Sequence, residues 1–308
     1  MELLNPNKIN LKFSKYHKPM LILSAITTII ALVLLFAPGI NYGIDFKGGI
    51  EAHLRFSDKT DIATLRTTLD PALTNVSVVG FSDAANEFLI TAQEDDKASI
   101  TQALTGALTG HYGAASAETW QVLTMDVVGA KVGEGLLKSA ILAIVYTCLL
   151  ITVFMYWRFD LRFAPGALFC IFHDLVIVGG FLALTGIEFS TTVVAALLTL
   201  AGYSINDTVV VYDRIRETES KYLGKTKVQI VDYAVNSTLS RTIMTTATTL
   251  VSCAVLYFLG GIALRDFAAT LFVGIIVGTY SSIYVAAPVY VWASEKFKIQ
   301  EGTVATTR

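Results

Sequence analysis

The chain has 308 residues, of which 54% are hydrophobic and 16% are charged, and its formal net charge is −2. Its mean hydropathy is +0.59. Soluble globular proteins carry more charge, with roughly a quarter of their residues charged. The composition therefore excludes a soluble globular protein and predicts an α-helical membrane protein.

Six apolar runs are long enough to cross a hydrocarbon core, which takes about 20 helical residues. They lie at 20–37, 135–157, 163–184, 190–212, 241–258 and 267–291. The first run ends in Phe36-Ala37-Pro38-Gly39, which lacks the small-x-small pattern of a signal-peptide cleavage site. We therefore expect a retained membrane helix at 20–38 and five further membrane helices within 135–293.

Basic residues gather before the first run, after the last run, and in the linkers after the second and fourth runs. They are Lys8, Lys12, Lys15, Lys18, Arg158, Arg162, Arg214, Arg216, Lys221, Lys225, Lys227, Lys296, Lys298 and Arg308. The positive-inside rule then places both termini, 1–19 and 294–308, in the cytoplasm of a multi-pass membrane protein. An amphipathic, solvated connector is expected at 214–236.

Residues 39–134 are predicted to fold in water on the outer side of the membrane. Residues 50–56 alternate between apolar and polar, which is the period of a half-buried strand. Helices are predicted at 62–69 and 100–108, and further strands at 76–81, 87–92 and 119–127. The order strand–helix–strand–strand–helix–strand is that of the split βαβ arrangement. We expect a small α+β ferredoxin-like domain.

The segment that enters this domain, YGIDFKGG at 42–49, is rich in glycine. Glycine permits positive φ angles and the close approach of other backbone segments. Neither the G-x-x-x-x-G-K-[ST] nor the G-x-G-x-x-G spacing of phosphate-binding loops is present. We therefore interpret the segment as a structural junction.

Two carboxylates and one guanidinium, Asp174, Asp207 and Arg241, fall inside or at the edge of apolar runs. A charge at the centre of a membrane costs ~2.5–3.5 kcal/mol on insertion scales, so such residues usually face a protein interior or water. Asp207 lies two turns before the cytoplasmic end of its run, and Arg241 opens the next run on that side. The two are predicted to pair, either as partners in proton transfer or as a static ion pair.

Asp174 is predicted near the middle of the bilayer, next to His173. Consecutive helical residues point ~100° apart, so the two are not expected to face one narrow pathway together. Asp174 either relays protons or accepts hydrogen bonds from the hydroxyl-rich run 241–258. In that run Thr245, Thr248 and Ser252 share a face with Arg241 and serve either as interhelical contacts or as a wet proton path.

Small residues predict close helix packing at two places. Gly179-Gly180 lies in the third run, and Gly274 and Gly278 form a GxxxG pattern in the sixth. Each face is expected to meet either a neighbouring helix or a partner subunit.

Several motifs together resemble the SecD/SecF family of protein-export membrane proteins. They are YGIDFKGG at 42–49, VGAKVG at 128–133, WRFDLRFAPG at 157–166, FHD at 172–174, GYSINDTVVVYDRIRE at 202–217 and SRTIMTTATTL at 240–250. The resemblance covers almost the whole chain. It implies a six-helix half of an RND-type transporter fold, the other half coming from SecD. It also implies that the membrane is the inner (cell) membrane and that the domain at 39–134 lies in the periplasm.

The resemblance also implies a function: an accessory subunit that uses the proton motive force to help the Sec translocon move preproteins across the cytoplasmic membrane. The implied partners are SecD, the SecYEG translocon, YajC and, at the periplasmic domain, the unfolded preprotein. The family's proton-passage positions match Asp207 and Arg241. Asp174, His173 and Thr245 are further candidates for the proton relay.

Two other functions are considered. An RND-type exporter of small molecules or lipids suits the fold but is disfavoured by the single small outer domain. An intramembrane aspartyl protease would use Asp174 and Asp207, but its GxGD element is absent from the sequence. No cofactor loop, metal-ligand cluster or nucleic-acid motif stands out, so we expect a transport protein without enzymatic activity, cofactor or metal.

Overall fold

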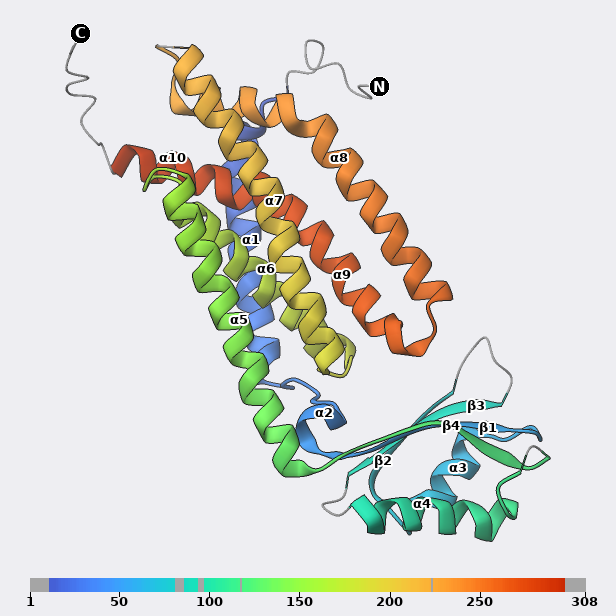
Figure 1. The fold of residues 1–308 in the computed structure, drawn as a ribbon. Helices are drawn as coiled ribbons and strands as arrows, with labels where there is room; N and C mark the ends of the chain where they lie inside the picture. Colours follow the sequence, from blue (N-terminus) through green and yellow to red (C-terminus); the bar gives the residue numbers. More distant parts are fainter. Residues whose placement is uncertain (1–10, 81–85, 94–96, 117, 223, 297–308) are drawn as a thin grey trace. The chain divides into compact units, whose positions relative to one another are not determined.

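The computed structural model describes every residue except 1–10, 81–85, 94–96, 117, 223 and 297–308 (Figure 1). The chain divides into two compact units. The helical unit comprises Met1–Ile40, Ala143–Ile187 and Thr192–Arg308, and the sheet unit comprises Asn41–Leu142 and Glu188–Thr191. Each unit has its own hydrophobic core.

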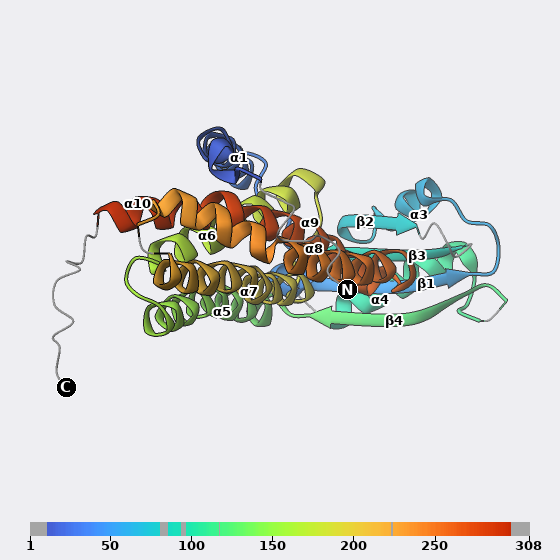
Figure 2. The same cartoon turned by 90° about the horizontal axis from the view of Figure 1, so that it is seen from above.

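Six helices in the described part of the chain are long and apolar enough to span a membrane, as predicted. They are α1 (His17–Phe36), α5 (Ala130–Arg158), α6 (Ala164–Thr185), α7 (Thr191–Lys221), α8 (Lys227–Leu259) and α9 (Ile262–Ser281), which continues through the π-helical turn η2 (Ser282–Ala286) into α10 (Ala287–Lys296). Viewed from above, α1 and α5 lie on opposite sides of the bundle (Figure 2). Much of α6 is buried between its neighbours.

The connector predicted at 214–236 is largely helical, because the two adjoining helices extend through most of it. α7 continues to Lys221, and its buried face includes Ile215 and Thr218. α8 begins at Lys227 after a capping box, in which Thr226 and Gln229 each accept the other's backbone N–H. At 1.5 Å per residue, α7 is ~46 Å long, which exceeds the ~30 Å of a hydrocarbon core.

Close packing between helices depends on glycines at two places in the helical unit. A Cβ atom added to Gly180 would lie 2.5 Å from the Cβ of Ala31 on α1. One added to Gly274 would lie 2.5 Å from the Leu200 side chain on α7. Both predicted glycine faces therefore pack against helices of this same chain.

The segment that precedes α1 is fastened to the first turns of α8. The backbone N–H and the hydroxyl of Ser14 donate to the two carboxylate oxygens of Asp232, at 2.8 and 2.5 Å. Leu11 forms a reciprocal pair with the Asn236 amide, at 3.0 and 2.8 Å. Phe13, which opens the short helix η1 (Phe13–Tyr16), is buried in the core of the helical unit.

Stepwise removal of these bonds is expected to lower the thermal stability of the protein in two increments. Ser14→Ala deletes one bond to a charged acceptor and should cost about 1.5 kcal/mol. Asp232→Ala deletes both bonds and should cost about 3 kcal/mol. Thermal unfolding of the purified protein measures both variants. Equal losses of stability in the two variants would show that the Ser14 hydroxyl makes the whole stabilising contribution. Unfolding midpoints unchanged in both variants would contradict the expectation that these bonds stabilise the protein.

The sheet unit has the predicted split βαβ order. Its elements are β1 (Gly49–Phe56), α3 (Ile62–Leu69), β2 (Thr74–Gly80), β3 (Glu87–Gln93), α4 (Lys97–Tyr112) and β4 (Trp120–Val128). The strand order is β2-β3-β1-β4, and every neighbouring pair is antiparallel. α3 and α4 cover one face of the sheet (Figure 1), and the alternating residues Ile50, Ala52 and Leu54 are fully buried beneath them. Part of the predicted strand 76–81 and the turn after it lie outside the described residues.

The glycine-rich segment forms a close backbone junction in the sheet unit, as predicted. The short helix α2 (Ile44–Lys47) ends at Gly48, whose φ is +78°, and Gly49 follows with φ at +136°. Asp45 accepts hydrogen bonds from both the backbone N–H and the hydroxyl of Thr191, at 2.8 and 2.7 Å. The junction therefore holds the residue from which α7 begins.

Candidate functional site

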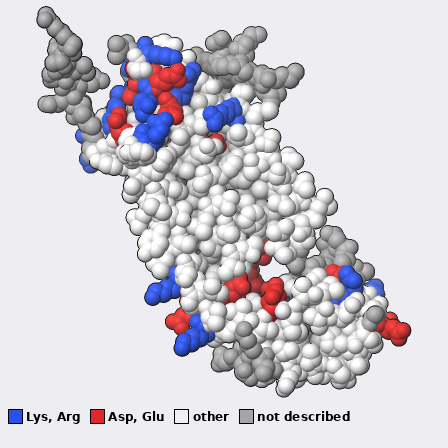
Figure 3. Space-filling view, viewed as in Figure 1, with Lys and Arg blue, Asp and Glu red and all other residues white. Residues whose placement is uncertain are grey.

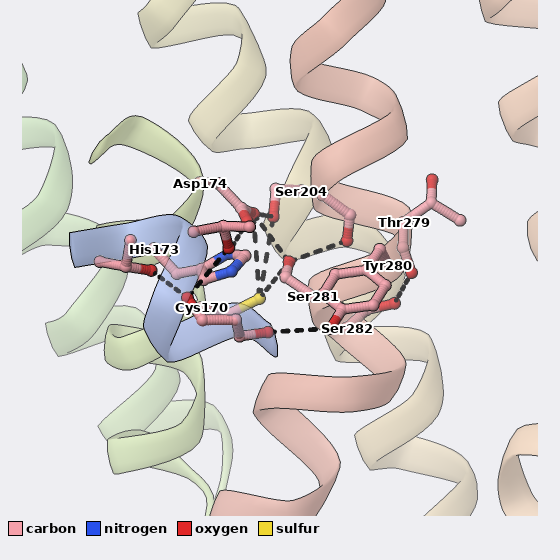
Figure 4. A network of polar contacts seen from close by, with 12 residues as sticks. Cys170, His173, Asp174, Ser204, Thr279, Tyr280, Ser281 and Ser282 are labelled. Carbon is pink, nitrogen blue, oxygen red and sulfur yellow. Dashed lines mark hydrogen bonds and ion pairs between the residues drawn. The ribbon is translucent and has the colours of Figure 1, made fainter. Parts of the chain in front are cut away.

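Asp174 lies on α6 and is 1% exposed. Its Oδ2 accepts hydrogen bonds from the Ser204 hydroxyl of α7 at 2.5 Å and from the Ser281 hydroxyl of α9 at 2.9 Å (Figure 4). Cys170, one turn earlier on α6, places its sulfur 3.9 Å from the same oxygen and 2.9 Å from the Ser281 hydroxyl. We call Cys170, His173, Asp174, Ser204 and Ser281 the Asp174 cluster.

His173 completes this cluster. Its Nδ1 lies 2.9 Å from Asp174 Oδ1, so the two side chains meet although their Cα–Cβ bonds diverge. The contact forms because the imidazole reaches around the helix to its neighbour. That the two residues do not face one narrow pathway together stays a prediction. His173 Nε2 is buried, with no hydrogen-bond partner in the described part of the chain. The ring stacks on Tyr280 of α9.

The donors to Asp174 are not the ones the sequence suggested. We considered hydroxyls of the run 241–258, on α8, but those that contact Asp174 come from α7 and α9. Ser204 lies three residues before Asp207 in the most specific motif, which is the one sequence signal that could have identified it. Ser281 carries no such signal, because its role depends on how α9 packs against α6.

Asp207 lies on α7 and is 3% exposed. Its Oδ2 is buried and has no hydrogen-bond partner among the described residues. The hydroxyl of Tyr203, one turn earlier on the same face, is also buried and has no hydrogen-bond partner among the described residues. An unpaired buried carboxylate is costly to keep ionised, so this position favours a carboxyl group that takes up a proton.

Arg241 lies on α8 and is exposed. No ion pair joins it to Asp207 in the part of the chain that the structure describes, so the predicted direct pair is not formed. Arg241 instead lines an open cavity of about 630 Å³ between α7 and α8. The other lining residues are Val210, Asp213, Arg214, Arg216, Glu217, Ser220 and Thr238. Val210 lies one turn after Asp207, so the cavity reaches the neighbourhood of this carboxylate.

The cavity lies where the charged side chains of the helical unit gather. Figure 3 shows Lys, Arg, Asp and Glu concentrated over the α7–α8 junction, and a largely uncharged surface along the helices. Arg214 Nε donates to the Ser237 hydroxyl at 2.8 Å, and Lys227 Nζ donates to Glu219 at 2.6 Å. These contacts join the two helices beyond the cavity, while Arg241 remains free to face it.

The hydroxyl stripe of α8 contributes less than expected. Thr245 donates to the backbone carbonyls of Arg241 and Thr242, and Thr248 and Ser252 likewise bond back to their own helix. Such back-bonding is a common way to satisfy hydroxyls in apolar helices. Among the threonine and serine hydroxyls of the run, Thr246 reaches another helix, at 2.9 Å from the Thr279 hydroxyl of α9. The interhelical role is thus seen at Thr246.

The site holds carboxylates, hydroxyls, one imidazole and one guanidinium. Among the described residues, no three His, Cys, Asp or Glu side chains are grouped closely enough to hold a metal ion. The two buried carboxyls, one of which contacts a histidine, can accept and release protons. A polar cavity lies near the other carboxyl. The arrangement therefore suits proton transfer.

Two protein-family models match the chain. "Protein export membrane protein SecD/SecF, C-terminal" matches residues 110–296. "SecD/SecF GG Motif" matches residues 33–59, which include Gly48 and Gly49. Together they cover both the sheet unit's entry segment and the helices that carry the site.

Similar curated proteins belong to the same family. The chain is 40% identical over 277 residues to the protein translocase subunit SecF of Desulfurispirillum indicum, covering 87% of each chain. It is 35% identical over 288 residues to that of Rickettsia rickettsii, covering 92% of each.

Solved structures extend the similarity to the fold. The crystal structure of SecDF, a translocon-associated membrane protein from Thermus thermophilus, matches with a TM-score of 0.83 and 35% identity, over 94% of this chain and 39% of that one. A crystal structure of SecDF in its super-membrane-facing form matches with a TM-score of 0.67 and 36% identity. This chain spans about two fifths of SecDF, and the predicted RND-type fold is confirmed. The chain belongs to the SecD/SecF family of protein export membrane proteins.

Proposed function

We propose that this chain, together with SecD, uses the proton motive force to promote preprotein translocation by the Sec machinery. One observation carries the proposal. Asp207 is a buried carboxylate with an unpaired oxygen, one turn from a polar cavity lined by Arg241. Family membership supports protein export as the process that this site serves.

Asp207 is the proposed proton carrier. Its carboxyl is neutral when protonated and fits the apolar bundle; when it releases the proton, the new charge favours water or a cation. One charge moved through 100 mV gains ~2.3 kcal/mol, which is enough to bias two helix arrangements. Uptake and release of protons at Asp207 would thus drive a conformational cycle.

Arg241 is the proposed partner of the ionised state. A guanidinium does not titrate in proteins, so it can attract a carboxylate without competing for the proton. The open cavity leaves room for α7 and α8 to approach. We infer that Arg241 approaches Asp207 when the carboxyl is ionised and withdraws when it is neutral, with Thr245 beside the path.

Topology and partners follow from the same proposal. The distribution of the basic residues supports a topology with both termini in the cytoplasm, and family membership supports an inner-membrane protein whose sheet unit lies in the periplasm. Six helices form half of an RND-type fold, so SecD supplies the facing half. The SecYEG translocon, YajC and the unfolded preprotein are further proposed partners, the preprotein at the sheet unit.

Inverted membrane vesicles that contain the translocon and SecD test the proposal. Adding this chain should stimulate late translocation of a preprotein, and an uncoupler should remove that stimulation while ATP-driven steps continue. Vesicles without the chain provide the baseline. Stimulation that survives the uncoupler would contradict proton coupling, and gradient-driven efflux of a small solute without any effect on the preprotein would favour the exporter function.

A further inference from the structure

Ser281 lies within hydrogen-bond distance of two competing acceptors. Its hydroxyl oxygen is 2.9 Å from Asp174 Oδ2 and 3.0 Å from the carbonyl oxygen of Gly278, on its own helix. A hydroxyl has a single hydrogen, so it makes a full-strength bond to one of them at a time. The position of this hydrogen therefore distinguishes two states of the site.

Protonation of the Asp174 cluster decides between these states. With the His173 Nδ1–H donated to Oδ1, a proton that arrives at Asp174 is taken on Oδ2. Oδ2 then becomes a hydrogen-bond donor and needs an acceptor. The Ser281 oxygen can accept from it once the Ser281 hydrogen turns to the Gly278 carbonyl. The Ser204 hydroxyl, in contrast, can stay on the remaining lone pair of Oδ2.

Ser281 is also the residue at which the helix changes type. α9 ends at Ser281, and the π-helical turn η2 begins at Ser282. π-helical turns are rare and occur frequently at functional sites. Hydroxyls that bond back to the preceding turn bend helices. A change in the Ser281 hydrogen bond therefore acts directly on the start of η2.

The other end of η2 is held by a buried side chain of α7. The Tyr212 hydroxyl donates to the carbonyl of Ala286, the last residue of η2, at 3.1 Å. A Cβ atom on Gly166 of α6 would lie 2.7 Å from this carbonyl oxygen and still closer to the Tyr212 hydroxyl. The turn is thus confined between α6 and α7, and a shift at Ser281 is transmitted to α10 rather than absorbed locally.

We propose that Ser281 is a positioning residue that couples the protonation of Asp174 to the π-helical turn η2. This inference rests on the proposed proton-driven function and names a second proton-sensitive site within it. In the ionised state Ser281 is tied to α6 and α7 through the carboxylate. In the protonated state it is released to α9, and the α9–η2–α10 helix is free to take a second arrangement.

The titratable neighbours of Asp174 are few in the described part of the chain. His173 contacts Oδ1, and Cys170 faces Oδ2, both from α6. From α9, Tyr280 stacks on His173, but its hydroxyl donates to the Met20 carbonyl of α1. α7 contributes the hydroxyls of Ser204 and Thr208, which do not titrate in this range. His173 is therefore the titratable side chain that contacts the Asp174 carboxylate most closely, at 2.9 Å.

Hydrogen exchange of the full chain with SecD in lipid nanodiscs tests the coupling, with residues 282–290 followed as a function of pH. In the wild-type protein their protection factor, which is the intrinsic exchange rate at each pH divided by the observed rate, should change with pH. Ser281→Ala should abolish that pH dependence, and Ser281→Thr, which keeps a hydroxyl, should restore it. Ser204→Ala is the matched control: it removes the other donor to the same oxygen, and the pH dependence should persist with a shifted midpoint.

Asp174→Asn provides a second variant. Its Nδ2–H can stand in for the proton of the neutral carboxyl, so the protection factor of 282–290 should match that of the wild-type protein at acidic pH, and it should do so at every pH. A Ser281→Ala protein with the wild-type pH dependence, or an Asp174→Asn protein that still responds to pH, would overturn the inference. Either result in a protein whose export still requires Asp207 would leave the proposed function intact. Export that does not require Asp207 would instead overturn the proposed function.

Discussion

Asp207→Asn is expected to abolish the gradient-dependent component of preprotein export. Asparagine keeps the size and polarity of the side chain but cannot take up or release a proton. One proton crossing 100 mV supplies ~2.3 kcal/mol, which corresponds to about a fiftyfold bias in an equilibrium. Losing it should lower gradient-dependent export by about tenfold or more. Export in inverted vesicles with and without an uncoupler measures the effect.

The control for this substitution is Asp160→Asn, which makes the same chemical change between α5 and α6. The Asp160 carboxylate is exposed and pairs with Arg162 at 3.0 Å, and exposed pairs contribute little. Its variant should export at nearly the wild-type rate. Association with SecD, followed by co-purification, should survive in both variants. Wild-type export by Asp207→Asn would exclude Asp207 as the proton carrier.

Arg241→Met extends this test to the proposed partner. If the two residues act as one unit, the double variant should be no more impaired than either single variant. The two side chains do not form an ion pair in the described structure, so such coupling would have to arise in another arrangement of α7 and α8. Strict additivity on the free-energy scale would show that they also act independently during the cycle.

Sequence patterns predicted the spans and the sheet well because both follow from local periodicity. The alternation around Ile50–Leu54 reports which face of β1 is buried, and long apolar runs report the membrane helices. Helix ends were less accessible: α7 continues to Lys221 because Arg, Glu and Lys sustain a helix as readily as they form a connector. The apolar run stops at the membrane boundary, but the helix continues beyond it.

The sequence identified most residues of the candidate site, but it predicted few of the contacts between them. Hydropathy gave the depth of Asp207 and Arg241, and this suggested a pair. It could not give the direction that each side chain faces around its helix, and Arg241 turns to the cavity instead. Asp174 takes its donors from residues 30 and 107 positions away. Such contacts depend on tertiary packing, which periodicity does not encode.

The entry segment of the sheet unit supports the largest predicted effect on stability. Gly49 has a φ of +136°, a conformation that residues with a side chain rarely adopt. A Cβ atom there would lie 2.2 Å from the carbonyl oxygen of Ala92, on the neighbouring strand β3. The next residue, Ile50, is fully buried and paired with Ala92. An added methyl group therefore forces β1 and β3 apart at a fully packed position.

Gly49→Ala is accordingly expected to destabilise the sheet unit by about 3 kcal/mol or more, from backbone strain and the clash together. Limited proteolysis of the full chain in membranes should show cleavage within 49–128 at protease concentrations that leave the wild-type protein intact. Gly106→Ala is the matched control, because it lies within α4 and a Cβ atom there meets nothing within 4 Å. Alanine favours a helix interior over glycine by roughly 0.5–1 kcal/mol, so this variant should resist proteolysis at least as well as the wild type. Equal resistance of the two alanine variants would show that β1 can shift to admit a side chain, and that the glycines at 48–49 serve a purpose other than close backbone packing.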